Sequence, residues 1–221
     1  MIIRLPKTFT YRDKNNNGSA YVLDGVLYIR GNVNFRNLMY KVTFELKGQE
    51  RCQYCGKLLT PRNRTIDHMY PQSFGGPSIT ENLLPCCKRC NLDKRDMTYM
   101  QFQEWRKIES LSEKEKFFQK CINENQKVKR KGKFLVKKGW ITKVNIKEMV
   151  EHMSFKSISS LKMRKTEEHF EEFKQYKKPI IISANGWLLE GKQNLKCAKN
   201  HKRYRICAVV LDNVIVEKNS P

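Results

Sequence analysis

Two Cys-x-x-Cys pairs constrain this chain more than any other feature of its sequence. Cys52 and Cys55 form the first pair, and Cys87 and Cys90 form the second. Two intervening residues let both sulfurs of a pair turn toward one ion, and four thiolates suit the soft, tetrahedral preference of zinc. We therefore expect a structural zinc site that substitutes for part of a hydrophobic core in a small folded unit.

Cys86 directly precedes Cys87 and is the alternative ligand. Pairing Cys86 with Cys90 leaves a three-residue gap, so we assign Cys87 to the metal and Cys86 to a buried neighbour. The first residues lack the apolar segment of a signal peptide, which predicts a cytoplasmic protein. In that compartment, 8 cysteines indicate metal-bound or free thiols rather than a disulfide framework.

Positive charge is the second constraint, since 44 Lys and Arg against 22 Asp and Glu give a formal net charge of +22. Such an excess favours a polyanionic partner, and a phosphate backbone is the natural one. The densest stretch, Lys127 to Lys143, holds eight cations and no acid. Charge alone does not separate this interpretation from a generally basic protein, such as a ribosome-associated one. No apolar run is long enough to span a bilayer, so we expect no membrane partner.

Local patterns predict a mixed α+β chain. β-forming residues on both sides of Asp24-Gly25 predict a hairpin over residues 20–29 with a type I′ turn. Ser112 and Glu115 have the spacing of a capping box at the start of a helix. The aromatic residues between 99 and 140 favour core positions over base stacking, most clearly at the helical spacing of 99–118. Further strands are expected at 39–46, 179–182, 187–189 and 205–211, and helices at 99–108, 112–123, 146–153, 166–176 and 191–200.

Between and just after the cysteine pairs lie residues that a structural zinc ribbon does not need. In chain order they are Asp67-His68, Gly75-Gly76, Asn82, Asn91 and Lys94. With the cysteines, this combination over residues 50–96 resembles the HNH endonuclease family. The resemblance implies a ββα-metal fold, with Asp67 and His68 at the end of a strand, Asn82 in a loop and Asn91 on the following helix.

The resemblance also implies a role for each residue. His68 is the general base that activates water, for which an imidazole with a pKa near neutrality is suited. Asp67 and Asn91 hold one divalent ion, Mg²⁺ or in its place Mn²⁺ or Ni²⁺, which stabilises the leaving 3′ oxygen. Asn91 stands where the family has His or Asn, so the chain looks like an HNN variant with modest metal affinity. Asn82 orients the base and its loop.

Other interpretations stay open for several of these residues. Asn82 and Asn91 could instead cap a helix or a turn. The cations around the motif either grip a phosphate backbone or form a solvated face; they are Arg62, Arg64, Lys88, Arg89, Lys94 and Arg95. The three other histidines lie outside any motif, and we interpret them as ordinary side chains: His152, His169 and His201.

The carboxy-terminal part carries a second resemblance. Pro179 to Gly191, a helix, and then Ala208 to Asp212 are similar to the amino-terminal domain of the ParB-like family. That family has a His-His-Arg type run after the glycine, where this chain has Lys192-Gln193-Asn194. The resemblance thus implies the fold and not the activity. An unrelated small α+β domain is the alternative, and its cations suggest DNA contact or protein docking.

These patterns give an α+β fold class, with an HNH nuclease module held by a four-cysteine zinc site and a small carboxy-terminal ParB-like domain. The predicted organisation is a β-hairpin and strand region at 1–46, the nuclease domain with its following helices at 47–124, a basic linker at 125–144 and the ParB-like domain at 145–221.

The predicted function is a metal-dependent endonuclease acting on DNA, expected to be double-stranded, in a phage, a mobile element or a defence system. The alternatives are a catalytically inactive zinc-dependent DNA-binding protein and a nuclease directed at RNA. A double-strand cut by a single-site enzyme needs two sequential nicks or two copies, so a homodimer is one of two options.

Overall fold

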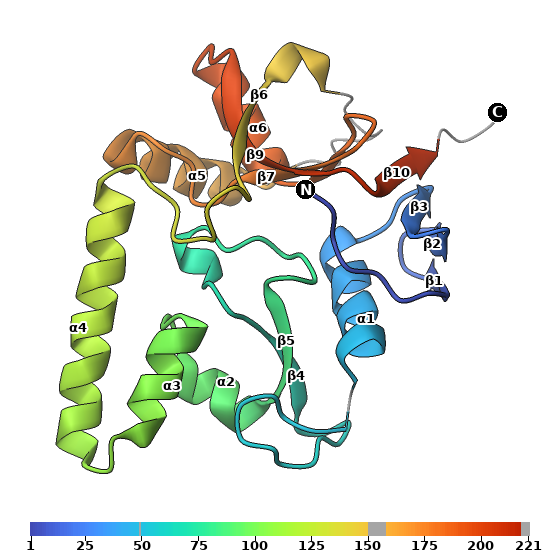
Figure 1. Ribbon diagram of the computed structural model, residues 1–221. Coiled ribbons are helices and arrows are strands. Elements are labelled where there is room, and N and C mark those ends of the chain that lie inside the picture. The colour runs from blue at the N-terminus through green and yellow to red at the C-terminus, as the bar shows by residue number, and fades with distance from the viewer. Residues whose placement is uncertain (49, 150–157, 218–221) are drawn as a thin grey trace.

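The computed structural model describes residues 1–48, 50–149 and 158–217, and within them the chain has a mixed α+β arrangement with three sheets (Figure 1). The strands are β1 (Phe9–Asp13), β2 (Gly18–Leu23), β3 (Val26–Arg30), β4 (Arg64–His68), β5 (Leu83–Cys87), β6 (Thr142–Asn145), β7 (Ile180–Ser183), β8 (Leu188–Glu190), β9 (Arg205–Leu211) and β10 (Val214–Glu217). The helices are α1 (Phe35–Lys47), α2 (Lys88–Lys94), α3 (Tyr99–Lys107), α4 (Leu111–Arg130), α5 (Ser160–Phe173) and α6 (Lys192–Asn200), with short 3-10 turns η1 (Gln72–Phe74) and η2 (Ile146–Glu148).

The first sheet joins the two ends of the described chain, in the order β1-β2-β3-β10. The predicted hairpin is confirmed as β2 and β3, and Asp24 and Gly25 both have positive φ, of 48° and 75°, as a type I′ turn requires. β10 pairs in parallel with β3, with Val214 opposite Leu27. Neither β10 nor β1 was expected from the sequence, and the pairing of β10 brings the last described residues beside the amino-terminal hairpin (Figure 1).

The strand predicted at residues 39–46 is wrong, because this segment belongs to helix α1. The buried residues Phe35, Leu38, Met39 and Val42 recur at helical spacing and turn one face toward the core. Asn34 caps the helix by accepting a hydrogen bond from Asn37 N. The β-branched and aromatic residues that favoured a strand are tolerated because their packing outweighs propensity.

Helix α3 confirms the helix predicted at 99–108, and helix α4 changes the bounds of the helix predicted at 112–123. α4 begins at Leu111, where Ser110 accepts from Glu113 N at 3.5 Å, so the predicted capping box of Ser112 and Glu115 does not form the start. The helix continues to Arg130. The stretch predicted as a linker at 125–144 is therefore helical in its first part, and its last residues enter β6.

The carboxy-terminal sheet has the order β6-β9-β7-β8. Strands β7, β8 and β9 and helix α6 confirm the predictions there, and α5 runs over 160–173 rather than 166–176. A helix was predicted at 146–153, and its described part contains the short 3-10 turn η2. The rest of that prediction lies outside the described residues. A short antiparallel strand, β6, precedes it and pairs with β9.

One apolar cluster connects the amino-terminal sheet and α1 with β4, β5 and the carboxy-terminal sheet. It contains the fully buried side chains of Leu27 in β3, Leu38 in α1, Leu83 in β5 and Val209 in β9. Burying such aliphatic side chains stabilises the packed state by about 1.5–3 kcal/mol each. The strand pair β4–β5 is therefore held between the amino-terminal and carboxy-terminal elements. Among the described helices, none combines the length and the apolar composition that crossing a bilayer requires.

Candidate functional site

The motif residues lie on two short strands and the helix that follows them. β4 and β5 are antiparallel, with His68 opposite Leu83. α2 begins directly after β5, and Cys87 is its N-cap residue. The long connection between the two strands, residues 69–82, contains η1 and the two consecutive glycines. Asp67 and His68 thus lie at the end of β4, and Asn91 lies on α2, as the sequence predicted.

The two cysteine pairs come together into one cluster. The sulfurs of Cys52, Cys55, Cys87 and Cys90 all lie within 4.8 Å of one another, and those of Cys55 and Cys87 are 3.9 Å apart. A tetrahedral zinc ion with bonds of about 2.3 Å holds its sulfurs about 3.8 Å apart, so these four residues fit zinc. Cys86 is buried and outside the cluster, as expected for its alternate position on β5.

Backbone hydrogen bonds favour the thiolate form of Cys52, which is the form that binds a metal. Burial raises the pKa of Cys52, but hydrogen bonds from the backbone of Cys87, Cys55 and Tyr54 outweigh it and lower the pKa to about 7. In contrast, burial and the neighbouring thiols raise the pKa of Cys90. A metal binds the thiolate form, so binding at the Cys90 end must release a proton.

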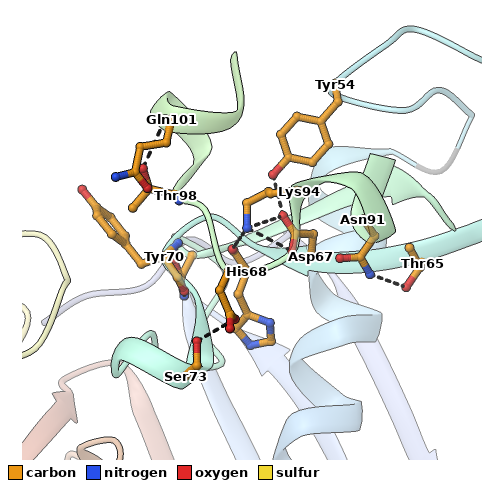
Figure 2. Close-up of polar contacts among 12 residues, drawn as sticks. Tyr54, Thr65, Asp67, His68, Tyr70, Ser73, Asn91, Lys94, Thr98 and Gln101 are labelled. Carbon is orange, nitrogen blue, oxygen red and sulfur yellow. Dashed lines mark hydrogen bonds and ion pairs between the residues drawn. The ribbon is translucent and has the colours of Figure 1, made fainter. Parts of the chain in front are cut away.

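Asp67 forms a buried, fully partnered carboxylate (Figure 2). Tyr54 donates its hydroxyl to Asp67 Oδ2 at 2.5 Å, and Lys94 Nζ lies 3.1 Å from the same oxygen. Burial and the adjacent Asp67 raise the pKa of Tyr54. Burial lowers the pKa of Lys94, and the attraction of Asp67 opposes this shift. Lys94 also donates to the carbonyl of His68 at 2.8 Å.

The position of Lys94 corrects one prediction. The sequence placed it among the cations that contact phosphate, but its side chain is only 1% exposed. A buried ammonium needs a counter-charge, and Asp67 supplies it. The other five predicted cations are at least partly accessible to solvent: Arg62, Arg64, Lys88, Arg89 and Arg95. Among them, Arg89 pairs with Asp93 at 2.9 Å, and Arg95 covers the ring of Phe118 at 3.5 Å.

His68 is enclosed by residues that no pattern singled out. Its side chain lies among buried groups and is 8% exposed. Gln72 Nε2 lies 3.0 Å from His68 Nε2, and Ser78 Oγ lies 3.2 Å from the same nitrogen. The Tyr40 ring stands edge-on to the imidazole, with centroids 6.2 Å apart. The only local signal for Gln72 was its place four residues after His68.

The charge around His68 comes from three distant segments. Glu190 at the end of β8 pairs with Arg36 of α1 at 3.0 Å and with Lys178. Burial would raise the pKa of Glu190, but Lys178 and Arg36 hold it below its usual value. Burial lowers the pKa of His68 to about 3, and the cations Arg36 and Lys178 add to this effect against Glu190. The imidazole is therefore neutral at pH 7.

Asn82 holds the loop rather than His68. Its Oδ1 accepts from Tyr70 N at 2.8 Å, and its Nδ2 donates to the carbonyls of Tyr70 and Pro77 at 3.1 and 2.9 Å. Gly76 is needed beside it, because a Cβ there would lie 1.8 Å from the Tyr70 carbonyl oxygen. Asn82 is fully buried, and its polar atoms are satisfied by backbone alone. Its contacts thus fix the path of the chain just after His68.

Asn91 stands on the α2 face that covers β4. Its Nδ2 donates to Thr65 Oγ1 at 3.4 Å, and Figure 2 shows both beside Asp67. Asp67 and Asn91 together offer a carboxylate and an amide oxygen, which are hard ligands of the kind that Mg²⁺ accepts. A divalent ion would accept donors of this kind and would take its remaining ligands from water or a phosphate oxygen.

The comparisons with known proteins bear on this part of the chain. Residues 52–104 match the HNH endonuclease family. We call residues 52–104 the HNH region. The chain also resembles a curated protein, the CRISPR-associated endonuclease Cas9 of Corynebacterium diphtheriae. The match is 36% identical over 66 residues, which are 29% of this chain and 6% of that protein. This chain therefore corresponds to a small part of that relative.

A solved structure of a Pnob8-like ParB-N domain is similar at 22% identity, covering 32% of this chain and 28% of that one, with a TM-score of 0.29. The likeness is too weak to support an argument about the carboxy-terminal fold, and the ParB-like prediction stays a prediction. The HNH region, by contrast, joins the four-cysteine cluster to Asp67, His68 and Asn91.

Proposed function

We propose that this chain is a metal-dependent endonuclease that hydrolyses phosphodiester bonds of DNA. The observation that carries the proposal is the β4–β5–α2 unit with the cysteine segment before it, which together bring Asp67, His68, Asn91 and the four cysteines into the HNH region. The net charge of +22 suits a phosphate backbone, and the Cas9 relative is named as an endonuclease. In this proposal the unit is a ββα-metal module.

His68 is the general base in this proposal. Its Nε2 is engaged by Gln72 and Ser78, which leaves Nδ1 to accept a proton from the attacking water. For that transfer the neutral ring must carry its hydrogen on Nε2 and donate it to Ser78 Oγ, with the Gln72 amide turned so that its oxygen rather than its nitrogen faces the ring. The low pKa keeps the ring unprotonated at neutral pH, and a bound phosphate would raise that pKa toward the value at which a base works best.

Two metals have separate roles. Asp67 and Asn91 would hold the catalytic ion, Mg²⁺ or in its place Mn²⁺ or Ni²⁺, which supplies stabilisation of the charge on the leaving 3′ oxygen. Lys94 neutralises Asp67 and, together with the Tyr54 hydroxyl that donates to the same carboxylate, fixes its orientation. Zn²⁺ at Cys52, Cys55, Cys87 and Cys90 would be structural, because four protein ligands leave no open position for a substrate.

A cleavage assay with supercoiled plasmid tests the proposal. The protein is incubated with Mg²⁺, Mn²⁺ or EDTA, beside His68→Ala and the control His201→Ala, a change at an exposed histidine outside the HNH region. We expect metal-dependent nicks or breaks from the wild type and from the control. Loss of a general base costs about 10²–10⁴-fold in rate, so His68→Ala should fall at least about 100-fold. Equal cleavage by all three proteins would refute the role of His68.

A second candidate is a catalytically inactive, zinc-dependent DNA-binding protein. It is favoured by the enclosure of His68 and by the engagement of both Asp67 oxygens, since binding needs only the cysteines and the positive charge. DNA binding without cleavage under any metal would support it. Parallel trials with duplex DNA, single strands and RNA would separate a DNA nuclease from the RNA-directed alternative.

The biological setting follows from the same proposal. A basic nuclease of this kind suits a phage, a mobile element or a defence system, and a confined set of cut sites on phage or bacterial DNA is expected. Uniform degradation of every substrate would contradict homing or restriction. We also propose the division of the chain into segments at 1–46, 47–124, 125–144 and 145–221, with a ParB-like domain in the last of them, and limited proteolysis would test these boundaries. We propose the homodimer as well, and sedimentation would test it.

A further inference from the structure

A cavity of about 630 Å³ opens beside the end of β4, where Met69 and Tyr70 line it. Its walls come from six separate segments: the first residues, the end of α1, the loop after β4, the start of α3, Asn125 of α4 and residues 135–140. The volume lies within the range of about 300–1,000 Å³ that is usual for ligand sites. None of the roles proposed above uses it.

Aromatic rings form two sides of this cavity. Tyr70 and Trp140 meet edge to face with centroids 5.7 Å apart, and Tyr99 lines the side toward α3. All three are partly exposed rather than fully buried. Met69, Leu135 and Met100 complete the apolar surface. Flat, partly exposed rings with flexible apolar neighbours offer a stacking surface for a planar ligand.

The charge at the cavity favours an anionic ligand. Its lining holds three cations, Arg4, Lys47 and Lys137, against a single acid, Glu81. Glu81 is already engaged, because Oε1 accepts from Arg4 N and Oε2 from Thr80 Oγ1. Arg4 and Lys137 are exposed at the rim, where they can meet a phosphate. A planar group joined to phosphate is a nucleotide unit.

The cavity and the candidate base share one stretch of chain. Met69 and Tyr70 directly follow His68, and Met69 O accepts from Tyr99 N at 2.8 Å. Asn82 fixes Tyr70 through hydrogen bonds to both its N and its O. A strand of nucleic acid whose phosphate reached His68 would therefore have a neighbouring base close to these rings.

We propose that this cavity binds a nucleobase of the substrate strand, unpaired or turned out of the duplex, next to the cleavage site. The inference rests on the proposed function for its choice of substrate. It assigns Trp140, Tyr99 and Tyr70 to base stacking and Lys137 and Arg4 to the adjoining phosphates. It also gives Asn82 a positioning role, because Asn82 holds the wall that carries Tyr70.

The test measures binding without cleavage, with zinc-loaded protein in a His68→Ala background and no added Mg²⁺. Single-stranded oligonucleotides and fully paired duplexes of the same sequence are titrated by fluorescence anisotropy. Trp140→Ala should weaken single-strand binding about 5- to 150-fold, which corresponds to about 1–3 kcal/mol for one stacked base. Trp140→Phe should retain most of the affinity, because the ring is kept.

Two controls protect the test from a merely structural effect. Met100→Glu places an acid at the cavity mouth on a side chain that is 66% exposed, and Leu111→Glu, at 83% exposed, is its match outside the cavity. Lys137→Ala is matched by its neighbour Lys138→Ala, which does not line the cavity. Weaker binding only in the cavity variants, at unchanged melting temperature, supports the proposal. Equal losses in both members of each pair overturn it.

An oligonucleotide series with one abasic position at a time identifies the base itself. One position should lose affinity by the same factor as Trp140→Ala, and combining both changes should add no further loss. If no position behaves in this way, the cavity does not bind a base. Plasmid cleavage by the unmodified protein is scored separately. Absence of cleavage with an intact abasic effect refutes the endonuclease and leaves the base site standing.

Discussion

The pKa of about 3 at His68 predicts a specific loss of stability in weak acid. The imidazole is neutral in the folded protein, whereas in the unfolded chain it titrates near 6.5. The folded pKa is the lower one, so the unfolded state binds the extra proton as the pH falls from 6.5 toward 3. Stability from this group is therefore fully present above pH 6.5 and is lost below it.

The magnitude follows from the two pKa values. One pKa unit corresponds to about 1.4 kcal/mol, so the free energy of unfolding should fall by about 2 kcal/mol between pH 7 and pH 5. Below pH 3 the loss levels off at about 4–5 kcal/mol. Other groups titrate in the same range, among them His169, whose pKa burial lowers to about 4. A variant changed at His68 alone isolates the contribution of this residue to the pH-dependent loss of stability.

Urea unfolding of zinc-loaded wild type and His68→Gln, at pH 7, 6 and 5, measures this difference. Glutamine does not titrate, and the other groups are the same in both proteins, so their effects cancel. The wild type should lose about 2 kcal/mol more than the variant between pH 7 and pH 5. Parallel losses in the two proteins would show that His68 is not held neutral by its surroundings, and would refute burial as the cause of a lowered pKa.

Three further substitutions test the framework of the site. Cys87→Ala should abolish zinc binding and unfold residues 51–96 locally, measured by metal content and hydrogen exchange, whereas Cys86→Ala should keep the zinc; the reverse result would exchange the two assignments. Gly76→Ala should lower the free energy of unfolding by at least about 1–3 kcal/mol, because its Cβ would overlap the Tyr70 carbonyl, and an unchanged melting temperature would contradict this. Lys94→Met should lower the free energy of unfolding by about 3–5 kcal/mol, because it leaves the buried Asp67 carboxylate without its counter-charge. A loss below about 1 kcal/mol in urea titrations would mean that Asp67 is not a buried, ionised carboxylate.

The sequence determined those parts of the site that depend on local spacing. The two cysteine pairs identified a metal cluster, because a two-residue gap sets the distance between sulfurs within one turn of chain. Asp24-Gly25 identified the hairpin for a similar reason, since only a few residues adopt positive φ at both turn positions. The motif around His68 likewise marked the strand end on which it lies.

Only the tertiary structure decided what surrounds these residues. Residues 39–46 form a helix because packing of Leu38, Met39 and Val42 outweighs their β propensity. The charged groups around the candidate base come from α1, from β8 and from Lys178 just before β7, segments that lie far before it and far after it in the chain. Such contacts are set by the packing of distant segments and leave no periodic pattern. For the same reason the enclosure of His68 and the aromatic cavity beside it were invisible in the sequence.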